Sequence, residues 1–539
     1  MLVLGAAAFG YGIYVAGGPG RAQHALVTDY VHAWASGSYA RMYSLLDSAS
    51  KKRVSEVRFV ADYQRAAATA TLQSLRPVRV GSASGGVIPV TMVAHTTVFG
   101  RLRETLLVPV DTSGSNPAVK FASTVLFPGL RPGERLTRRV SLAPRATLLA
   151  REGTPLAQGP NRTSPIPDVA SQIVGSLGPI PNAEAAAFRA QGYPADAKVG
   201  TDGLERIFQR QLAGKPGGRL LAGSRPLAHT AAKAGSSVTT TISPPIERAA
   251  VSAMGGNYAG IAAMQPSTGQ VLALAGVAFS ALQPPGSTMK MITATGALEA
   301  GIVKLDTEFP IQTSATISGF NLQNAGGEAC GGSFLNAFAV SCNSVFAPLG
   351  AKLGAKRLVD IAERFGFNQQ PTIPGAPEPT LPSAAHIGDD LAVGSSAIGQ
   401  GDVQANALEM MDVGATIAMG GRRPIPTLRM GQPPHFVHVT TPTVAGEVQR
   451  MMVAVVQFGT GTSAEIPGVT VAGKTGTAEL TDTANGSSSA SNTDAWFVGY
   501  APVGAPKIVV GALFPNQGAG GQTAAPAVRQ VLEAGLAAK

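Results

Sequence analysis

The sequence predicts an α+β protein of several domains, and three observations support this prediction. A chain of 539 residues is longer than one hydrophobic core normally serves, so we expect about two to four domains. Its composition is that of a globular protein, with 45% hydrophobic and 14% charged residues. Its last part has strand patterns at both ends and helical patterns between them, which predicts an antiparallel sheet flanked by helices, with an all-helical subdomain inserted.

The composition excludes several classes of function. The formal net charge of +10 comes from basic residues dispersed along the chain, without the basic and aromatic clusters of a nucleic-acid surface. Such a surface is better suited to anionic envelope polymers or lipid head groups. Two cysteines exclude a disulfide framework and a four-thiolate metal site, and no H-E-x-x-H pattern occurs among the 7 histidines. We therefore expect no metal, no other cofactor and no nucleic-acid partner.

Residues 1–18 are predicted to be a partial membrane anchor. Residues 2–16 are apolar and uncharged, and the first charge after them is Arg21. A full span needs about 20 residues, so the start of the anchor would lie before this sequence. A signal peptide is the alternative, but no convincing small-x-small cleavage site precedes the next domain. Both interpretations place the rest of the chain outside the cytoplasm.

Two regions are expected between the anchor and the C-terminal part. Residues 21–130 have the pattern of a small α+β domain. Its helices are expected at 22–46 and 58–70, and its strands at 77–80, 87–93, 97–110 and 119–127. Residues 131–227 contain many Gly and Pro breaks and one clear helix at 202–213, which is typical of an extended pedestal between two domains.

Residues 228–539 have the clearest pattern of elements. Strands at 258–264 and 270–275 flank the turn residues of a hairpin. Helices are expected at 288–300, 333–340, 354–365, 405–419 and 525–537, and further strands at 468–472, 495–500 and 507–514. The first and last strands are therefore expected to meet in one sheet.

Ser287 and Lys290 are the candidate nucleophile and base. They follow the helix-stopping residues 284–286 and begin a predicted helix. Three residues apart on a helix, the two side chains share a face, so the lysine can activate the serine. The spacing alone is weak evidence, because Ser48 and Lys51 repeat it in a polar stretch with no other catalytic feature nearby.

Two further motifs strengthen this assignment. Ser341-Cys342-Asn343 ends an apolar helical pattern, and Lys474-Thr475-Gly476-Thr477 lies within a strand pattern. In this order, S-x-x-K, S-x-N and K-T-G resemble the signature of the penicillin-recognising serine acyltransferases. Other stretches resemble class B penicillin-binding proteins, the membrane-anchored D,D-transpeptidases that cross-link peptidoglycan. The matching stretches are 201–205 with 214–217, 266–269, 285–287, 473–479 and 495–500.

The resemblance extends to the earlier regions. Residues 21–130 look like the nuclear-transport-factor-2-like domain of the subgroup that includes the methicillin-resistance transpeptidases. This implies a pedestal or dimerisation-like linker over 131–227 and a penicillin-binding domain of the serine β-lactamase/transpeptidase type over 228–539. There are two departures: the pedestal motif R-G-x-I-x-D-R-x-G lacks its Gly and Asp at 145–153, and the link between residues 269 and 285 is short.

The resemblance implies a catalytic role for five residues. Ser287 attacks an amide carbonyl, and Lys290 takes its proton if burial and the nearby ammonium of Lys474 lower the pKa of Lys290. Ser341 relays a proton to the leaving amine, and Asn343 holds the backbone amide of the substrate.

The strand motif is expected to bind the substrate. The hydroxyls of Thr475 and Thr477 are placed to bind a substrate carboxylate. Gly476 lets the substrate lie flat along the strand as an added strand. The backbone N–H groups of Ser287 and Thr477 would form the oxyanion hole.

The implied partners are peptidoglycan stem peptides, on lipid-linked precursor and nascent glycan, with β-lactams as covalent inhibitors. The membrane and a glycosyltransferase of the division or elongation machinery are further expected partners. Two alternatives stay open: a β-lactam-hydrolysing or β-lactam-sensing serine acyltransferase, and a catalytically idle cell-wall scaffold. The E-x-x-x-N loop that a class A β-lactamase needs between the second and third motifs is not found.

Cys330 and Cys342 are expected to be free thiols. An oxidising compartment would permit a bridge, but a helix over 333–341 would separate the two residues by about 13 Å. A disulfide needs Cα atoms within about 7 Å of each other.

Overall fold

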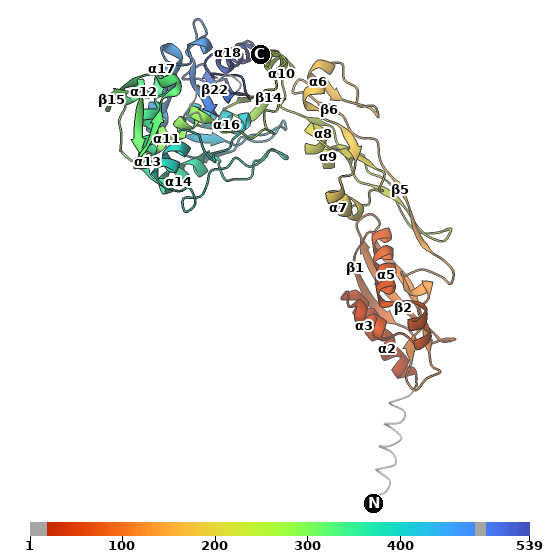
Figure 1. The fold of residues 1–539 in the computed structure, drawn as a ribbon. Coiled ribbons are helices and arrows are strands. Elements are labelled where there is room, and N and C mark those ends of the chain that lie inside the picture. Colours follow the sequence, from red (N-terminus) through yellow and green to blue (C-terminus); the bar gives the residue numbers. More distant parts are fainter. Residues whose placement is uncertain (1–18, 480–491, 539) are drawn as a thin grey trace, which may run out of the picture. The chain divides into compact units, whose positions relative to one another are not determined.

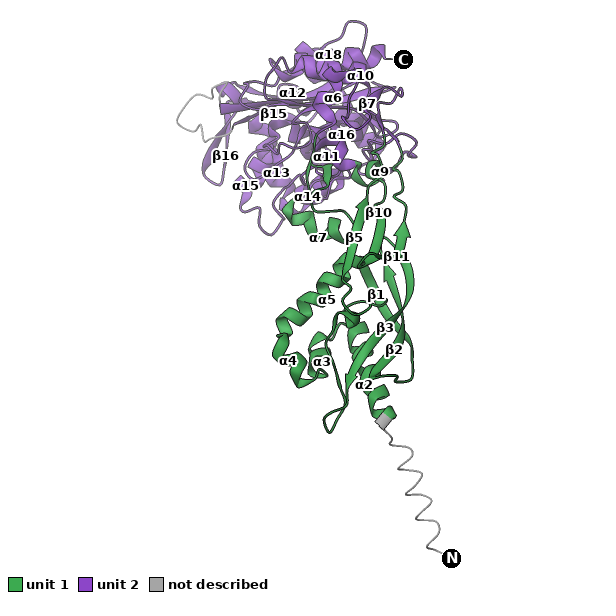
Figure 2. Ribbon diagram, turned by 90° about the vertical axis from the view of Figure 1, so that its right-hand side faces the viewer, with its two compact units in different colours: residues 1–146, 176–201, 208–236 green, residues 147–175, 202–207, 237–539 purple. Residues whose placement is uncertain are grey.

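The computed structural model describes residues 19–479 and 492–538, which divide into two compact units (Figure 2). Unit 1 comprises residues 19–146, 176–201 and 208–236, and unit 2 comprises residues 147–175, 202–207 and 237–538. The predicted anchor, residues 1–18, lies outside the described residues. None of the helices that the structure describes combines the length and apolar character needed to cross a bilayer.

Unit 1 begins with helices packed against an antiparallel sheet of order β1-β2-β3-β4 (Figure 1). The elements are α2 (Pro19–Ala35), α3 (Tyr39–Ser44), α4 (Ser48–Arg53), α5 (Glu56–Ala70), β1 (Leu72–Val80), β2 (Val87–Thr96), β3 (Gly100–Asp111) and β4 (Ala118–Val119). The helix expected at 22–46 is broken, because Gly37 turns the chain with φ +72°. The strand expected at 119–127 is also wrong after Val119. There the buried segment forms a 3-10 turn, and the Val125 carbonyl accepts a hydrogen bond from the Tyr63 hydroxyl.

The rest of unit 1 consists of short elements around a three-stranded sheet of order β11-β10-β5. They are β5 (Leu136–Ser141), β8 (Leu177–Pro179), α7 (Ala185–Ala190), β9 (Lys198–Gly200), α9 (Gln209–Ala213), β10 (Gly217–Ala222) and β11 (Arg225–Thr230). The single helix expected at 202–213 is instead two short helices, α8 (Gly203–Ile207) and α9. The chain leaves helical geometry between them at the buried Phe208.

Unit 2 is built on a five-stranded antiparallel sheet of order β14-β13-β23-β22-β21. Its strands are β13 (Gly260–Gln265), β14 (Gln270–Gly276), β21 (Ala472–Glu479), β22 (Thr493–Ala501) and β23 (Ile508–Phe514). The expected hairpin is present, and β13 pairs with β23, which confirms that the first and last strands meet. The strand expected at 468–472 starts only at Ala472, because Gly468 (φ +76°) closes a tight turn before it.

Helices cover both faces of this sheet (Figure 1). Alternate residues of β23 face opposite ways: Val510 and Ala512 share a core with α18 (Ala524–Ala537) and α10 (Pro244–Ala253). Gly511 lies against α16 (Ala407–Ala418), where an added Cβ would be 2.5 Å from the Ala407 carbonyl oxygen. The two-residue period of a strand thus places the two sets of helices on opposite faces.

The remaining elements of unit 2 form the helical lobe, short strand pairs and a small three-stranded sheet of order β12-β6-β7. Helices of the lobe are α11 (Lys290–Glu299), α12 (Phe334–Ala339), α13 (Asn343–Leu353), α14 (Ala355–Phe365), α15 (Asp390–Ala397) and α17 (Pro442–Gln457). The short strands are β6 (Leu148–Leu149), β7 (Pro155–Ala157), β12 (Val238–Thr239), β15 (Glu308–Gln312), β16 (Ser314–Ile317), β17 (Phe320–Gln323), β18 (Cys330–Ser333), β19 (Arg422–Pro424) and β20 (Phe436–His438); α6 spans Pro167–Ile173.

Candidate active site

Ser287 lies in a 3-10 turn, η3 (Gly286–Met289), that leads into α11. The α-helix expected from residue 288 therefore starts at Lys290. Gly286 has φ +52°, and an added Cβ there would lie 3.0 Å from the Thr477 carbonyl oxygen. The Thr288 hydroxyl donates a hydrogen bond to the Pro285 carbonyl (2.6 Å), which closes the turn. Ser287 is half-buried, whereas Thr288 is fully buried.

Lys290 is fully buried at the start of α11. Its Nζ donates to the carbonyl oxygen of Ser341 (2.7 Å), to Oδ1 of Asn343 (2.7 Å) and to Oγ of Ser341 (3.3 Å). Burial, and secondly the charge of Lys474, hold the pKa of Lys290 well below its ordinary value of 10.5. The Phe346 ring lies 5.5 Å from Nζ. Within the residues that the structure describes, no hydrogen bond joins Lys290 to the Ser287 hydroxyl.

Ser341 lies in the sharp connection between α12 and α13, and Asn343 is the first residue of α13. Ser341 has φ +63°, an unusual conformation for a residue other than glycine, which turns the chain back after α12. Its hydroxyl receives hydrogen bonds from both lysines, Lys290 (3.3 Å) and Lys474 (2.9 Å). The three motifs that lie far apart in the sequence thus meet at the Ser341 side chain.

Asn343 is held from two sides. Its Nδ2 donates to the Gln323 carbonyl (3.2 Å), and its Oδ1 accepts from Lys290. The neighbouring Asn324, a buried residue, accepts from the Ser344 N–H through Oδ1 (2.8 Å) and donates through Nδ2 to the Gln312 and Glu328 carbonyls. These contacts tie the start of α13 to the β16–β17 hairpin.

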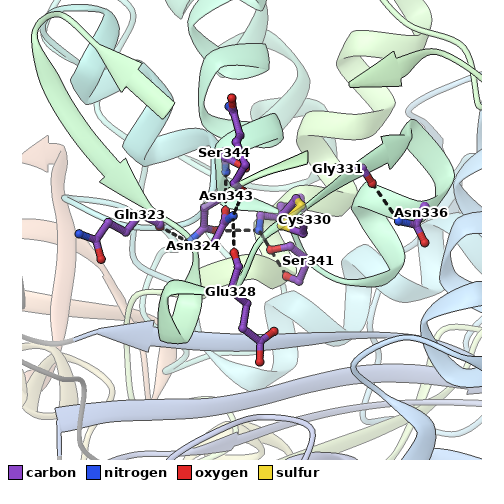
Figure 3. The surroundings of a disulfide bond; sticks show 12 residues. Gln323, Asn324, Glu328, Cys330, Gly331, Asn336, Ser341, Asn343 and Ser344 are labelled. Atoms are coloured by element: carbon purple, nitrogen blue, oxygen red, sulfur yellow. Dashed lines mark hydrogen bonds between the residues drawn. A yellow bond between two sulfur atoms is a disulfide. The ribbon is translucent and has the colours of Figure 1, made fainter. Parts of the chain in front are cut away.

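A disulfide joins Cys330 to Cys342 (Figure 3), so the prediction of two free thiols is wrong. The Cα atoms are 5.8 Å apart. The helix between them is shorter than expected, because α12 spans only Phe334–Ala339. In addition, β18 runs back along α12, where Asn336 Nδ2 donates to the Gly331 carbonyl (2.8 Å), so Cys330 lies beside the far end of the helix.

β21 carries the K-T-G motif at the edge of the sheet. Lys474 is fully buried, and burial lowers its pKa from 10.5 to about 7. Its Nζ donates to Ser341 Oγ and to the Thr475 carbonyl (3.0 Å), and lies 5.5 Å from the Phe338 ring. Among the described ion pairs, neither Lys474 nor Lys290 has a carboxylate partner.

The pairing of β21 shows which backbone groups point away from the sheet. In an antiparallel pair, alternate residues direct both N–H and C=O toward the partner strand or away from it. The Thr475 carbonyl accepts from Lys474 Nζ, and the Thr477 carbonyl lies beside Gly286. Because β21 pairs with β22 in register from Ala472 to Glu479, both threonines present their backbone groups at the open edge, on the side of η3.

The side chains of the motif are packed more tightly than the sequence suggested. The Thr475 hydroxyl shares a hydrogen bond with the Thr460 hydroxyl (2.5 Å), and the Thr477 hydroxyl accepts from the Gly520 N–H (3.3 Å). A Cβ on Gly476 would lie 2.8 Å from the Pro285 carbonyl oxygen. Glycine is therefore needed here for the close approach of the turn that carries Ser287.

Thr460 was missed by sequence reasoning. It follows α17 in the stretch Gly459-Thr460-Gly461-Thr462, whose likeness to the K-T-G-T motif is the one available signal. Its backbone N–H donates to the Ala339 carbonyl (3.1 Å), so Thr460 connects the end of α12 to β21.

Family models match three consecutive parts of the chain. A penicillin-binding protein transpeptidase domain matches residues 259–533, a penicillin-binding protein dimerisation domain matches residues 145–224, and an NTF2-like N-terminal transpeptidase domain matches residues 22–134.

Individual proteins are similar over much of the chain. The peptidoglycan D,D-transpeptidase PbpA of Mycobacterium tuberculosis is 32% identical over 370 residues, 56% of this chain and 73% of that protein. A penicillin G acyl-enzyme structure of penicillin-binding protein A from M. tuberculosis has a TM-score of 0.58 at 27% identity, over 73% of this chain and 99% of that one. The D,D-transpeptidase domain of a peptidoglycan glycosyltransferase from Eggerthella lenta has a TM-score of 0.61 at 29% identity, over 74% and 99%.

Proposed function

The chain belongs to the penicillin-binding protein transpeptidase family, and on this premise we propose that Ser287 is the nucleophile of a peptidoglycan D,D-transpeptidase. The observation that carries the proposal is the contact between the three motifs: Lys290, Ser341, Asn343 and Lys474 form one hydrogen-bonded group. This group lies next to the turn that carries Ser287 and the edge strand β21 beside it.

In the proposed acylation step, Ser287 Oγ attacks the carbonyl of the penultimate D-Ala of a stem peptide. The Oγ–carbonyl bond forms, the amide C–N bond breaks, and the terminal D-Ala leaves as an amine. The Ser287 proton passes to neutral Lys290, and a proton reaches the leaving amine through Ser341, whose hydroxyl touches both lysines. In the second step, an amine of a neighbouring stem peptide attacks the ester and releases Ser287.

Lys290 suits the role of base because its surroundings favour the neutral amine. An ammonium has three N–H groups and Lys290 has three acceptors, of which the Ser341 carbonyl and Asn343 Oδ1 are the closer. A neutral amine retains two N–H groups for these two acceptors, and its lone pair becomes available for the Ser287 proton. Burial and Lys474 both act in this direction.

The open edge of β21 suits a substrate that binds as an extended strand. Thr475 and Thr477 offer backbone groups there, and a peptide can pair with them as an added strand. The N–H groups of Thr477 and Ser287 are then the proposed donors to the oxyanion. We assign the substrate carboxylate to Lys474 and the hydroxyls of Thr475 and Thr477.

Intact-mass spectrometry after exposure to penicillin G tests the nucleophile. The wild-type protein is expected to gain one acyl adduct, and Ser287→Ala none. Ser48→Ala is the matched control, since Ser48 has the same S-x-x-K spacing, and it should label like the wild type. An adduct that persists in Ser287→Ala would contradict the assignment, and rapid turnover of nitrocefin would indicate the β-lactam-hydrolysing alternative.

The location and the partners of the enzyme are further proposals. Cross-linking of peptidoglycan places the catalytic domain outside the cytoplasm, and residues 1–18 are the proposed anchor. We also propose that a glycosyltransferase supplies the nascent glycan, since a stem peptide must be carried on a strand before it is cross-linked. Release of the chain from membranes by deletion of residues 1–18 would support the anchor, and unchanged sedimentation with membranes would contradict it.

A further inference from the structure

A short loop after α15 contacts both sides of the candidate active site. It consists of residues 398–401 (Ile398-Gly399-Gln400-Gly401), and we call it the bridging loop. Its Gly399 contacts the turn that carries Ser287, and its Gln400 contacts Glu479, the last residue of β21. None of the three catalytic motifs contains it.

Gly399 fixes the position of the nucleophile turn. The Gly286 N–H donates a hydrogen bond to the Gly399 carbonyl (2.9 Å). Gly399 has φ +74°, and an added Cβ would lie 2.1 Å from the Gly286 carbonyl oxygen. Because Gly286 directly precedes Ser287, this contact sets the backbone from which the Ser287 N–H projects.

Gln400 holds the end of the edge strand. With the amide oriented so that both of its ends find a partner, Nε2 donates to the Glu479 carbonyl (3.2 Å) and Oε1 accepts from the Glu479 N–H (3.1 Å). The primary amide thus makes the pair of hydrogen bonds that a neighbouring strand would make. Glu479 and Thr477 are two residues apart, so their backbone groups lie on the same edge of β21, and the edge left for a ligand ends at Thr477.

The bridging loop is itself held by the interior of unit 2. The buried Thr293 hydroxyl on α11 donates to the Ala397 carbonyl (2.6 Å), directly before the loop. The Gln400 N–H donates to the Ser395 carbonyl (3.0 Å) at the end of α15. The loop therefore connects the nucleophile turn, the helix that carries Lys290 and the edge strand.

We propose that Gln400 is a positioning residue that, together with Gly399, sets the separation between the Ser287 and Thr477 N–H groups and so the width of the oxyanion hole. It also stops strand pairing at Glu479 and thereby fixes the register in which a peptide or β-lactam adds to β21. This inference rests on the proposed roles of Ser287 and Thr477.

The main test compares Gln400→Ala with Gln404→Ala in the full chain, with fluorescent penicillin as the probe. Gln404 is the matched control, because it is four residues further along and the hydrogen bonds recorded for it are made by its main chain, with Thr380. We expect the second-order acylation rate constant of Gln400→Ala to fall about 10-fold to 100-fold. Gln404→Ala should stay within about twofold of the wild type. Equal rates for Gln400→Ala and the wild type would overturn the proposal.

Gln400→Glu adds a pH signature that a merely structural role would not give. A carboxylate cannot donate to the Glu479 carbonyl, but a carboxylic acid has one donor and one acceptor, as the amide has. The acylation rate relative to the wild type should therefore rise as the pH falls toward about 4.3, the ordinary pKa of Glu. The ratio at each pH removes the pH dependence that both proteins share. A ratio that does not change with pH counts against the hydrogen bond.

A pair of glycine variants tests the contact between the bridging loop and the turn that carries Ser287. Gly399→Ala and Gly401→Ala impose the same backbone strain, at φ +74° and φ +70°, but an added Cβ meets Gly286 only at 399 and open space at 401. We expect Gly399→Ala to acylate at least about tenfold more slowly than Gly401→Ala. If circular dichroism shows that Gly399→Ala does not fold, the Gln400 variants alone test the role of the bridging loop.

Failure of the inference can be separated from failure of the proposed function. If Ser287→Ala abolishes labelling while Gln400→Ala labels normally, only the role of Gln400 is wrong. If Ser287→Ala still labels, the assigned nucleophile is wrong, and with it the basis of the inference.

Discussion

The chain contains the S-x-x-K spacing twice, once in each unit, and only one copy lies in a setting for catalysis. Ser48 and Lys51 are exposed on α4, and Lys51 donates to the Ser44 carbonyl (2.7 Å). Ser287 is half-buried and Lys290 is fully buried, with a second lysine close by. The spacing places a lysine near a serine in both cases, but only the buried copy favours the neutral amine that the proposed base needs.

The two copies also differ in how the backbone N–H groups at the start of the helix are used. In α4, the Asp47 side chain caps the helix and accepts from the Ser50 N–H (2.6 Å). For η3, no side-chain cap is recorded among the described residues. Within the described residues the Ser287 N–H makes no hydrogen bond, which suits its proposed role as an oxyanion donor, whereas Asp47 caps the start of α4.

The largest effect is expected from replacing the lysine of the buried S-x-x-K copy, Lys290, compared with the lysine of the exposed copy, Lys51. Lys290→Met keeps the length of the side chain and removes the base, so the acylation rate by penicillin should fall about 10³-fold to 10⁴-fold. Lys51→Met should leave the rate unchanged. Stopped-flow measurements with fluorescent penicillin give both rates. A Lys290→Met protein that acylates normally would remove the distinction between the two copies.

Removal of the disulfide is expected to have the next largest effect. The S-x-x-K stretch in α4 has no disulfide near it, since Cys330 and Cys342 are the two cysteines of the chain. The bond closes a loop with a sequence separation of 12 residues next to Ser341 and Asn343. The double variant Cys330→Ala with Cys342→Ala should lose about 2–3 kcal/mol in the free energy of unfolding. Urea denaturation with and without reductant checks this value. Reductant should destabilise the wild type by a similar amount and leave the double variant unchanged.

Lys474 makes the stability of the protein depend on pH. Burial lowers its pKa from 10.5 to about 7, so between these pH values the unfolded chain holds a proton that the folded chain has released. Stability contributed by this group therefore rises with pH across that window, and below about pH 7 the full cost of burying the ammonium remains.

Lys474→Met should remove the free-energy cost of burying the ammonium and the change of stability with pH that comes with it. We expect the variant to be more stable than the wild type by about 1–3 kcal/mol at pH 7, with a smaller difference at pH 10, and to acylate slowly. Lys51→Met should change stability by less than about 0.5 kcal/mol at both pH values. Urea denaturation midpoints at the two pH values measure this difference. A stability difference between variant and wild type that grows with pH would contradict the lowered pKa of Lys474.

The smallest expected effect concerns Ser50, inside the S-x-x-K stretch that runs from Ser48 to Lys51. Ser50, between Ser48 and Lys51, is buried, and its hydroxyl accepts from the Phe121 N–H (2.9 Å). Ser50→Ala should cost about 1–2 kcal/mol of unfolding free energy and leave penicillin acylation unchanged. Thermal denaturation and gel labelling measure the two quantities. Slower acylation in a folded Ser50→Ala protein would mean that this copy also matters for the reaction.

The sequence alone was sufficient to predict local secondary structure and the order of the motifs along the chain. Hydrophobic periodicity and turn residues predict the hairpin of β13 and β14 and most helices of unit 2, because these depend on neighbouring residues. The order of the three motifs predicts the family. Strand patterns at both ends of residues 228–539, with helical patterns between them, predict a sheet whose first and last strands meet, as β13 and β23 do.

Only the tertiary structure decided what lies between the motifs. Cys330 pairs with Cys342 because β18 doubles back along α12, a path that a helical pattern does not contain. Gln400 reaches Glu479, and Thr460 reaches Thr475, across contacts that no local pattern encodes. The difference between Ser48 and Ser287 has the same origin. Desolvation of a lysine depends on the elements packed around it, so the same S-x-x-K spacing gives an exposed lysine in one unit and the proposed catalytic base in the other.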